Sequence, residues 1–375
     1  MNVLIVTFLA ATSPSGVVTY YKSLADDLAR EGVGVHVVSA TNTPYVWRKM
    51  LAVLKRILRS LGGAYHVFYD EFAYFTGLYL AVRNRRHESF DLIHAQDPRS
   101  GVAAYLALGK RVPIVLTCHF NDDPVTELAT TYSLKGWFLK KLTAWYKYLF
   151  SYVRHYVFVS NYAYEKSRHL LPATISKQIL YNTVNIKANR VTRRPSDPLL
   201  ISNVGYIDER KNQKLLIQIG HELRKRGITN FAIWLIGDGP KRSEYEQLVE
   251  SLGLGEQVKF YGRQAAPWQL VAQTDLYIHT ALNDNCPYSI IEAFAVKTPV
   301  LALPVGGVPE LLPQSHGPLQ GTDVVGLASE VATYFDPAAR TQLANAQSVF
   351  ADLKLNHQKA LADLISFYHQ SASNS

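Results

Sequence analysis

Residues 276–302 read LYIHTALNDNCPYSIIEAFAVKTPVLA, and the order of apolar and polar residues in this segment indicates the fold class. A short β-rich run at 276–279 leads into a loop, a helical pattern over 288–296 and a second β-rich run at 300–302. A strand, a helix and a strand in this order are typical of two parallel strands joined by a crossover helix. The segment therefore predicts an α/β fold.

The same alternation continues on both sides of this segment. Further strands are expected at 3–7, 35–39, 92–94, 114–117, 156–159, 199–204, 231–236 and 258–261, and helices at 20–30, 214–226 and 243–252. A polar stretch with turn-forming residues interrupts the pattern at 182–198. Because 375 residues are too many for one ordinary core, we expect two doubly wound domains in tandem, with their boundary in that stretch.

Cysteine content and hydropathy narrow the class of protein. Only Cys118 and Cys286 occur, far apart and without C-x-x-C spacing, so neither a disulfide framework nor a zinc site is expected. No apolar run reaches the roughly 18 residues that a membrane-spanning helix needs, and residues 1–10 lack the basic start of a signal peptide. We therefore expect a cytoplasmic protein.

The positive charge is concentrated in the first half of the chain. Residues 1–190 carry 23 Lys and Arg against 12 Asp and Glu, whereas residues 191–375 carry 16 against 18. The halves therefore differ in formal charge, +11 against −2. A basic half beside a nearly neutral half favours an anionic partner for the first half, either a nucleic acid or an acidic membrane surface.

Two segments of the first half are basic and amphipathic. Residues 47–61, from Trp47 to Leu61, predict a helix with an apolar stripe opposite a basic face. Residues 134–154, from Leu134 to Arg154, mix aromatic and basic side chains as interfacial segments do. Core helices with solvated basic faces would give the same pattern. Because no nucleic-acid-binding motif accompanies these charges, we expect membrane contact and no nucleic acid partner.

Two acids flank the start of the helix expected at 288–296. Asp284 lies in the preceding loop, and Glu292 lies eight residues later inside the helix. The first turn of the helix lies between them, and its unpaired N–H groups and positive dipole end suit a phosphate. The plainer interpretation is that Asp284 or Asn285 caps the helix and that Glu292 is an ordinary polar-face residue.

A pair of cations follows the strand expected at 199–204. Arg210 and Lys211 lie in the loop after this strand. In doubly wound sheets ligands bind beyond the carboxyl ends of the strands, so this loop and the one with Asp284 are expected on one side of the sheet. Lys and Arg there would neutralise a diphosphate leaving group. Adjacent cations on a surface are also commonly only solvated.

Other phosphate and hydrolase motifs are absent from the sequence. The turn at 237–240, Gly-Asp-Gly-Pro, has no third glycine at the spacing of a dinucleotide-binding loop, and no G-x-x-x-x-G-K-[ST] occurs. No G-x-S-x-G occurs either. The sequence therefore gives little support to an oxidoreductase, a P-loop NTPase or an α/β-hydrolase.

Taken together, these segments resemble the retaining GT-B nucleotide-sugar glycosyltransferases (glycosyl transferases group 1, glycosyltransferase family 4) over nearly the whole chain. In the second half, residues 204–212 resemble the family's V-G-R-x-x-x-x-K-N loop, 235–240 its G-D-G-P turn, 284–292 its motif of two glutamates eight residues apart, and 306–310 its G-G-x-x-E turn. Looser similarities follow in the same order in the first half, at Gly16, 91–95, 117–119 and 181–185.

The resemblance implies a GT-B fold, in which two Rossmann-like domains face a central cleft. Residues 1–185 would form the domain that binds the acceptor, and a C-terminal helix at about 357–372 would pack back on it. Residues 186–356 would form the domain that binds the donor, a nucleotide diphosphate sugar. The acceptor would be lipid-linked or a saccharide.

Transferred position by position, the resemblance also implies roles for individual residues. Arg210 and Lys211 would hold the diphosphate, and Asp284 would bind hydroxyls of the transferred sugar. Glu292 would bind the ribose. His119 would lie beside the anomeric carbon, although a lone histidine is more often structural. The other residues expected at the donor are Gly16, Gly205, Gly262, Arg263, Gln264, Asn285, Cys286, Pro287, Tyr288 and Ser289.

Thr183 and Asn185 depart from the family's interdomain turn, and two further departures lie in the donor loops. Asp284 stands where the first glutamate is usual, and Tyr206 where an arginine is common. The resemblance implies sugar transfer with retention of anomeric configuration, without an obligatory metal or a cofactor, in polysaccharide or glycolipid assembly. Two alternatives stay open: a nucleotide-sugar hydrolase or epimerase that needs no acceptor, and a non-catalytic nucleotide-sugar-binding scaffold, which the two departures in the donor loops favour slightly.

Overall fold

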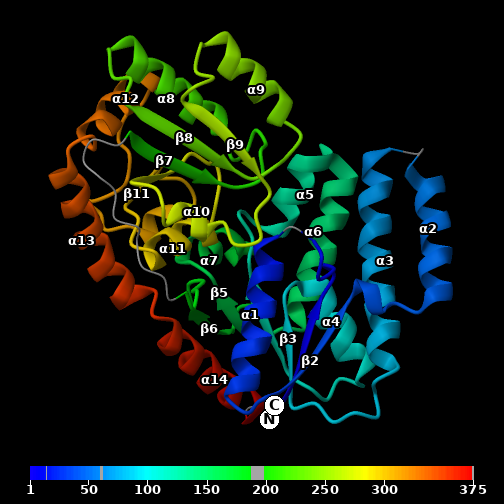
Figure 1. The fold of residues 1–375 in the computed structure, drawn as a ribbon. Coiled ribbons are helices and arrows are strands. Elements are labelled where there is room, and N and C mark those ends of the chain that lie inside the picture. The colour runs from blue at the N-terminus through cyan, green and yellow to red at the C-terminus, as the bar shows by residue number, and fades with distance from the viewer. Residues whose placement is uncertain (14, 60–61, 187–197, 374–375) are drawn as a thin grey trace. The chain divides into compact units, whose positions relative to one another are not determined.

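The computed structural model describes residues 1–13, 15–59, 62–186 and 198–373 (Figure 1). The chain divides into two compact units. Unit 1 comprises Met1–Tyr181 and Gln358–Ser375, and unit 2 comprises Asn182–His357. Each unit contains one parallel sheet with helices, so the predicted α/β architecture is confirmed. Within the described ranges, none of the helices combines the length and the apolar character that crossing a bilayer requires.

Unit 1 is built on a six-stranded parallel sheet with the order β2-β1-β3-β4-β5-β6. Its strands are β1 (Asn2–Thr7), β2 (Gly34–Ser39), β3 (Leu92–Ala95), β4 (Ile114–Cys118), β5 (His155–Phe158) and β6 (Ser176–Ile179). Its helices are α1 (Gly16–Arg30), α2 (Tyr45–Arg59), α3 (Gly63–Arg83), α4 (Pro98–Ala107), α5 (Pro124–Tyr132), α6 (Gly136–Ser151), α7 (Asn161–Ser167) and α14 (His357–Ser373), with the 3-10 turns η1 (Ala40–Asn42) and η2 (Arg168–Leu170).

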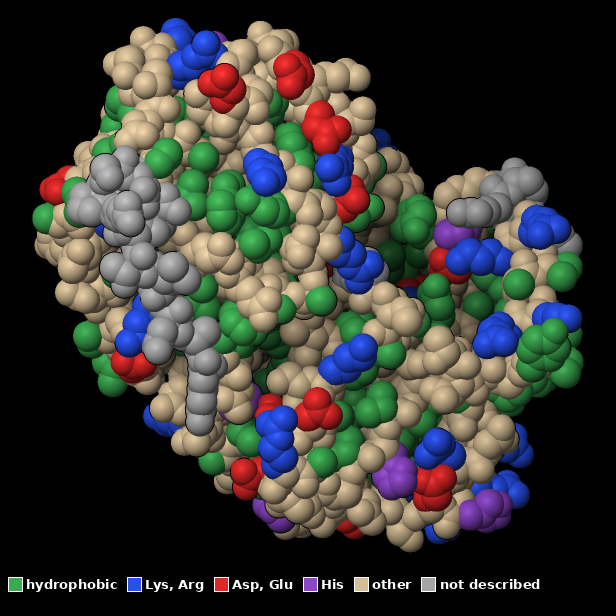
Figure 2. All heavy atoms as spheres, in the orientation of Figure 1, with side chains coloured by type: hydrophobic (Ala, Val, Ile, Leu, Met, Phe, Trp, Pro, Cys, Tyr) green, Lys and Arg blue, Asp and Glu red, His purple; other side chains and the backbone are tan. Residues whose placement is uncertain are grey.

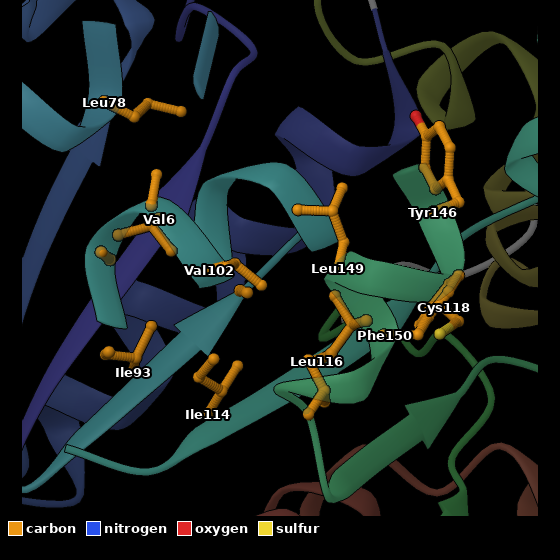
Figure 3. Close-up of a cluster of buried hydrophobic side chains, with 14 of the residues drawn as sticks. Val6, Leu78, Ile93, Val102, Ile114, Leu116, Cys118, Tyr146, Leu149 and Phe150 are labelled. Carbon is orange, nitrogen blue, oxygen red and sulfur yellow. The ribbon is translucent and has the colours of Figure 1, made fainter. Parts of the chain in front are cut away.

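Apolar side chains cover both faces of this sheet. Successive side chains of a strand point to opposite faces, so Leu4 and Val6 pack in a cluster with residues of α3, α4 and α6 (Figure 3). Val3 and Ile5 pack in another cluster with residues of α1 and α14. Burial on both faces explains why β1 is an unbroken apolar run in the sequence.

The last helix, α14, covers one face of the unit 1 sheet. Truncation of a buried side chain of this helix should therefore lower the stability of the protein. Phe367 of α14 is 1% exposed and packs in the cluster with Val3 and Ile5. We expect Phe367→Ala to lower the free energy of unfolding by about 3–5 kcal/mol, because it leaves a cavity in the core. Urea unfolding measures this loss. Val349→Ala is the control, because Val349 is 63% exposed and its truncation should change stability by no more than ~0.5 kcal/mol; equal effects of the two changes would contradict the packing of α14.

Unit 2 has a five-stranded parallel sheet with the order β11-β10-β7-β8-β9. Its strands are β7 (Leu199–Val204), β8 (Phe231–Ile236), β9 (Val258–Gly262), β10 (Leu276–His279) and β11 (Val300–Ala302). Its helices are α8 (Gln213–Lys225), α9 (Arg242–Ser251), α10 (Trp268–Val271), α11 (Tyr288–Ala295), α12 (Val324–Thr333) and α13 (Pro337–Lys354), with the 3-10 turn η3 (Val308–Leu311).

The strand order of unit 2 reverses between β7 and β10. The chain runs from β7 to β8 and β9 on one side, and then returns to place β10 and β11 on the other side. Strands β7 and β10 pair directly, with Leu276 opposite Ile201 and Tyr277 opposite Ser202. The loops that follow these two strands therefore begin side by side, and such a switch point is where doubly wound sheets bind their ligands.

Candidate functional site

Hydrogen bonds join the loops after β7 and β10. Thr280 Oγ1 donates to the carbonyl oxygen of Lys211 over 2.9 Å, and the Leu282 N–H donates to the carbonyl oxygen of Arg210 over 2.8 Å. Within the first loop, Asp208 Oδ1 accepts from the Lys211 N–H at 2.7 Å. These contacts fix the backbone of both cations against the loop that carries Asp284.

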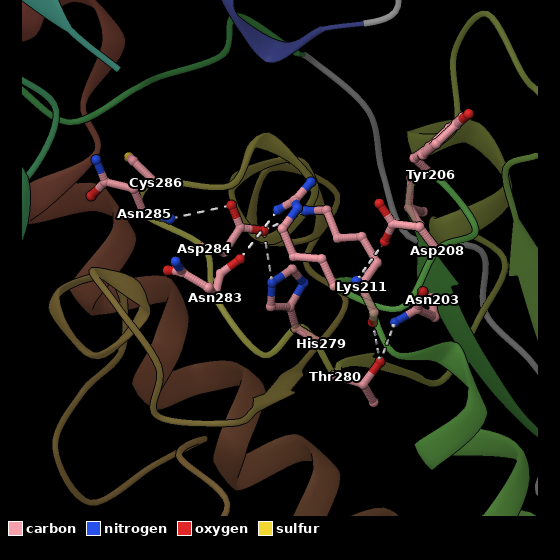
Figure 4. A network of polar contacts seen from close by, with 12 residues as sticks. Asn203, Tyr206, Asp208, Lys211, His279, Thr280, Asn283, Asp284, Asn285 and Cys286 are labelled. Atoms are coloured by element: carbon pink, nitrogen blue, oxygen red, sulfur yellow. Dashed lines mark hydrogen bonds and ion pairs between the residues drawn. The ribbon is translucent and has the colours of Figure 1, made fainter. Parts of the chain in front are cut away.

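Lys211 from the loop after β7 and His279 from the end of β10 meet at Asp284 (Figure 4). Lys211 Nζ pairs with Asp284 Oδ2, and His279 Nε2 lies 3.1 Å from the same oxygen. Asp284 is 7% and His279 is 1% exposed, so the contacts are shielded from water. Burial alone would raise the pKa of Asp284, but the Lys211 charge and the His279 contact outweigh it and hold that pKa well below its usual range. Asp284 is therefore ionised at neutral pH.

The backbone around Asp284 is held from the loop after β11. The Gly307 N–H donates to the Asp284 carbonyl oxygen at 3.0 Å. Gly306 has φ +57°, and a Cβ atom there would overlap the same carbonyl group. Glycine is thus required at 306 both for the backbone conformation and for the close approach. Asp284 Oδ1 accepts from the Asn285 N–H at 3.2 Å, so each carboxylate oxygen has at least one donor.

The first turn of α11 lies directly after this loop, and its cap differs from the plainer expectation. Pro287 is the N-cap residue, and no side chain within the described part of the chain caps the helix. Asp284 therefore does not act as the cap, and its carboxylate contacts Lys211 and His279 instead. A helix N-terminus without a side-chain cap keeps its N–H groups available to an anion.

Glu292 lies on α11, and burial dominates its titration. The side chain is half-buried, and burial raises the pKa of Glu292 to about 7 from 4.5. The described residues contribute no hydrogen bond or ion pair to its carboxyl group. A half-buried carboxyl group without a partner is costly in an empty protein, and it suits a ligand with hydroxyl groups.

The other residues expected at the donor lie around the same edge of unit 2. Gly205 follows β7, and its N–H donates to the carbonyl oxygen of Ile236 at 3.0 Å. Cys286 is buried, and its carbonyl oxygen accepts from Asn182 Nδ2 at 2.7 Å. At the end of the edge strand β9 are Gly262 and then the exposed Arg263 and Gln264. Tyr288 and Ser289 begin α11.

His119 and Gly16 belong to unit 1. Gly16 is the first residue of α1, whose N-cap is Ser15. His119 follows β4, and its Nε2 lies 2.9 Å from Gln96 Oε1. The Tyr20 ring packs edge-on against the His119 ring, with 4.7 Å between centroids. Burial lowers the pKa of His119 to about 3, so the ring is neutral at pH 7 and can take part in hydrogen bonds without carrying a charge.

A chain of buried polar contacts continues from Tyr20 to the C-terminal helix. Tyr20 Oη lies 3.4 Å from Thr117 Oγ1, which lies 2.6 Å from His94 Nε2. On the other side of the ring, His94 Nδ1 lies 2.6 Å from Tyr368 Oη of α14. Burial lowers the pKa of His94 to about 3. These contacts fix the side chains that surround His119.

Sequence reasoning missed His279, Tyr277 and Gln96. His279 and Tyr277 are in the apolar run that predicts β10, where a polar side chain has no evident task. Gln96 directly follows β3. Their position at or near a carboxyl strand end was the available indication. In the described part of the chain, no cluster of His, Cys, Asp or Glu could hold a metal ion.

Unit 1 also has an exposed apolar surface on α2. Helix α2 packs on α3, where Lys55 Nζ pairs with Asp70 at 2.8 Å, and Leu51 and Leu58 of α2 are half-buried. Of the predicted apolar stripe, Trp47, Met50 and Leu54 are exposed, and Figure 2 shows hydrophobic and basic side chains together at the right edge, where Figure 1 shows α2. The exposed apolar residues of α2 are Tyr45, Val46, Trp47, Met50, Val53 and Leu54. Ile57 and Leu61, also predicted for the stripe, lie outside the described side chains.

The second basic segment divides between the surface and the interior. Trp137 and Tyr148 of α6 are exposed, as are Lys140, Lys141 and Lys147. Trp145 instead donates its indole N–H to Glu71 at 2.9 Å. The start of α6, which carries Trp137, is its exposed end. This exposed end of α6 adjoins α3, because Tyr65 of α3 packs against Phe138 with 5.4 Å between ring centroids.

Two protein families match consecutive parts of the chain. "Glycosyltransferase Family 4" matches residues 14–187, and "Glycosyl transferases group 1" matches residues 185–319. The first covers most of unit 1, and the second covers the part of unit 2 that contains the Lys211 and Asp284 loops.

Curated relatives match parts of the chain. The lipopolysaccharide core biosynthesis glycosyltransferase LpsD of Rhizobium meliloti is 27% identical over 172 residues, 45% of this chain and 48% of that protein. The N-acetyl-alpha-D-glucosaminyl L-malate synthase of Bacillus anthracis is 25% identical over 249 residues, 62% of this chain and 61% of that protein. The chain thus spans between about half and three fifths of the length of these relatives.

Solved structures match the fold over its full length. The Anabaena protein HepE in complex with UDP and glucose superposes with a TM-score of 0.71 at 16% identity, covering 99% of this chain and 100% of HepE. Sucrose-phosphate synthase of Thermosynechococcus elongatus gives a TM-score of 0.73 at 16% identity, covering 100% of both chains. The predicted GT-B fold is confirmed by these similarities.

Proposed function

The chain belongs to the GT-B glycosyltransferases of group 1 and family 4, and we propose that it transfers a sugar from a nucleotide diphosphate sugar to a membrane-bound or saccharide acceptor in polysaccharide or glycolipid assembly. The observation that carries the proposal is the cluster at the switch point of unit 2. There Lys211 and Asp284 meet beside a helix N-terminus without a side-chain cap. Proteins of related fold or sequence include HepE, solved with UDP and glucose, and several glycosyltransferases.

The donor diphosphate would bind to Lys211, Arg210 and the first turn of α11, where positive charge and N–H groups converge. Asp284 would accept hydrogen bonds from hydroxyls of the transferred sugar, and Glu292 would accept them from the ribose. The base would lie near Gly262 and the two residues after it. Charge that develops on the leaving diphosphate would be neutralised by groups that are already in place. We therefore propose a reaction that needs no metal ion.

We propose a catalytic role for His119 of unit 1. Because burial lowers the pKa of His119 to about 3, its neutral ring would donate or accept a hydrogen bond and would not act as a cation. We propose that the anomeric configuration of the sugar is retained, as the family membership suggests. Proton NMR of the first product formed distinguishes the two anomers directly.

The experiment that tests the proposal is a thermal-shift titration with UDP, GDP, ADP and their sugar conjugates. A ligand that binds only the folded protein adds about 2.7 kcal/mol of stability at a concentration of 100 times its Kd. We expect a shift with one base and a larger shift with a sugar conjugate of that base. The absence of a shift with every nucleotide would refute the donor site.

Assays of the same purified protein distinguish a glycosyltransferase from the two alternative functions. Release of free sugar or of an epimer without any acceptor would favour a hydrolase or epimerase. Tight donor binding without turnover, over a panel of lipid and saccharide acceptors, would favour a nucleotide-sugar-binding scaffold. Sugar transfer that depends on the acceptor contradicts both.

We further propose that unit 1 binds the anionic cytoplasmic face of a membrane through α2 and the exposed end of α6. Exposed apolar side chains of α2, including Val46, Met50 and Val53, lie on a helix that also exposes Arg48 and Lys49. An amphipathic helix of this kind inserts its apolar side chains at the headgroup boundary, while its cations attract anionic lipid. A lipid-linked acceptor would be presented at the same surface.

The membrane proposal predicts a large effect of two surface changes. We expect the chain to co-sediment with phosphatidylglycerol vesicles, to do so less in high salt, and to leave phosphatidylcholine vesicles unbound. Met50→Asp with Val53→Asp should abolish co-sedimentation without loss of stability, because both side chains are more than half exposed. The control, Val349→Asp with Leu353→Asp, changes two apolar residues of α13 that are at least as exposed and should leave binding unchanged. Equal loss with both pairs, or a preference for DNA over vesicles, would contradict the proposal.

A further inference from the structure

His279 contacts Asp284 from the interior of the unit 2 sheet. Strand β10 pairs with β11, where His279 lies opposite Ala302, and the His279 carbonyl oxygen accepts from the Leu303 N–H at 3.1 Å. With 1% of its surface exposed, the side chain cannot reach solvent. The imidazole is thus positioned by a central strand, whereas Asp284 lies on a loop. Groups on rigid elements hold a site more accurately than groups on loops.

The contacts of the ring determine which nitrogen carries the proton. Asp284 is ionised and can only accept, so the nitrogen that faces it at 3.1 Å, Nε2, must carry hydrogen. Burial lowers the pKa of His279, although Asp284 opposes this effect, so the ring has a single proton at neutral pH. Nδ1 then carries no hydrogen, and Tyr277 Oη, which also donates to the Val204 carbonyl oxygen, lies 3.3 Å from it. The imidazole thus lies between Tyr277 and Asp284, and its contact with the Asp284 carboxylate is a close approach of opposite polarity at ion-pair distance.

The two oxygens of Asp284 have different surroundings. Oδ2 contacts both Lys211 and His279, whereas Oδ1 accepts only the Asn285 N–H among the contacts of the described residues (Figure 4). A carboxylate oxygen can accept more than one hydrogen bond, so Oδ1 can accept a further one from a ligand hydroxyl. In the proposed reaction Lys211 binds the diphosphate, and it cannot also remain the main partner of Asp284. His279 then keeps Oδ2 in place.

We propose that His279 is a positioning residue that fixes Asp284 with Oδ1 directed to the donor sugar, and that it keeps this orientation when Lys211 moves to the diphosphate. The inference rests on the proposed function, because Asp284 is taken to bind the sugar. It also accounts for how an aspartate, one methylene shorter than a glutamate, is held firmly enough to select a sugar.

The proposal predicts that changes at His279 affect the sugar and spare the diphosphate. His279→Leu removes the donor at similar size, and His279→Gln retains an N–H group near the position of Nε2. For His279→Leu we expect the Kd of the sugar conjugate and the turnover to worsen by about 10- to 100-fold, as when groups that orient a site are removed. The Kd of the nucleoside diphosphate alone should stay within about twofold, and His279→Gln should recover most of the loss.

Calorimetric titration of the purified full chain with UDP and with UDP-glucose, or with the pair that the thermal shifts select, measures both constants. Unchanged diphosphate binding also demonstrates that the variant is folded. Equal weakening of both ligands would reduce His279 to a structural residue and overturn the inference, as would wild-type sugar binding by His279→Leu. If the wild-type chain binds neither ligand, the proposed function itself is wrong and the inference fails with it.

Discussion

Lys211→Ala is expected to lower turnover strongly and also to destabilise unit 2. In the proposed reaction Lys211 neutralises charge on the leaving diphosphate, and loss of one such preplaced group costs about 100- to 1000-fold in turnover. Its removal also leaves the Asp284 carboxylate buried without a cation, with His279 and the Asn285 N–H beside it. Breaking a buried pair by removing one partner costs about 3 kcal/mol or more. Initial rates and urea unfolding measure the two effects.

The stability loss of Lys211→Ala should depend on pH. In the wild type the pKa of Asp284 lies below the 3.8 of an exposed aspartate, because the Lys211 charge and the His279 contact outweigh burial. The unfolded chain therefore binds a proton more readily, so this contribution is full above about pH 5 and is lost as the pH falls through the folded-state pKa. Without Lys211 burial raises that pKa. The difference between the two proteins should be largest at neutral pH and shrink in acid.

Two further variants separate charge from folding. Adding Asp284→Asn to Lys211→Ala removes the unpaired charge, so we expect stability to return while activity stays lost. Lys225→Ala breaks the ion pair with Glu222 on the surface of α8, where Lys225 is 60% exposed, and it should change stability by no more than ~1 kcal/mol. A Lys211→Ala protein with wild-type turnover would refute the assignment of the diphosphate site.

The second-half strands could be predicted from the sequence almost to the residue. Runs such as 199–204, 231–236 and 276–279 are mostly apolar because both faces of the sheet are covered, and turn residues mark their ends. Strand β6 (Ser176–Ile179) had no such pattern, because its residues SKQI form an edge strand that is exposed or half-exposed. The α3 helix was not predicted as an element.

The sequence placed Lys211 and Asp284 at strand ends but could not pair them. The residues are 73 positions apart, and their contact follows from the adjacency of β7 and β10, which depends on the order in which the strands return to the sheet. His279 was hidden for a related reason. Within a strand of four buried residues it looks like part of the core, and only the position of the Asp284 loop gives its Nε2 a partner. Whether these residues act as proposed stays a prediction.

Glu292→Gln is expected to stabilise the protein and to weaken its binding of the donor. Burial raises the pKa of Glu292 to about 7 from 4.5, so the folded state binds its proton more tightly than the unfolded state does. Ionised Glu292 therefore costs stability as the pH rises above 4.5, and the full cost is present above about pH 7. This difference between the two pKa values corresponds to about 3 kcal/mol in the free energy of unfolding. Glutamine has no charge to bury, so the gain should be about 3 kcal/mol at pH 8 and about 1 kcal/mol at pH 5.

Ionisation of Glu292 should also change the affinity for the donor, but in the opposite direction: affinity should rise with pH, whereas stability falls. Ribose hydroxyls that donate to the carboxylate favour its ionised form, so binding lowers the pKa of Glu292 and releases a proton. Affinity for the nucleotide sugar should therefore rise with pH through about 7 and level off above it. A nucleotide sugar is the suitable ligand, because its diphosphate is a diester and does not titrate in this range. For Glu292→Gln the affinity should be lower and independent of pH.

The two readouts together distinguish a binding carboxylate from a buried structural one. Unfolding in urea at pH 8 and at pH 5 gives the stability gain, and calorimetric titration at the same two pH values gives the affinity. A structural Glu292 would yield the gain without any change in donor affinity. A Glu292→Gln protein that is no more stable than the wild type at pH 8 would mean that the carboxyl group is solvated, and the pH dependence of binding would then have to come from another group.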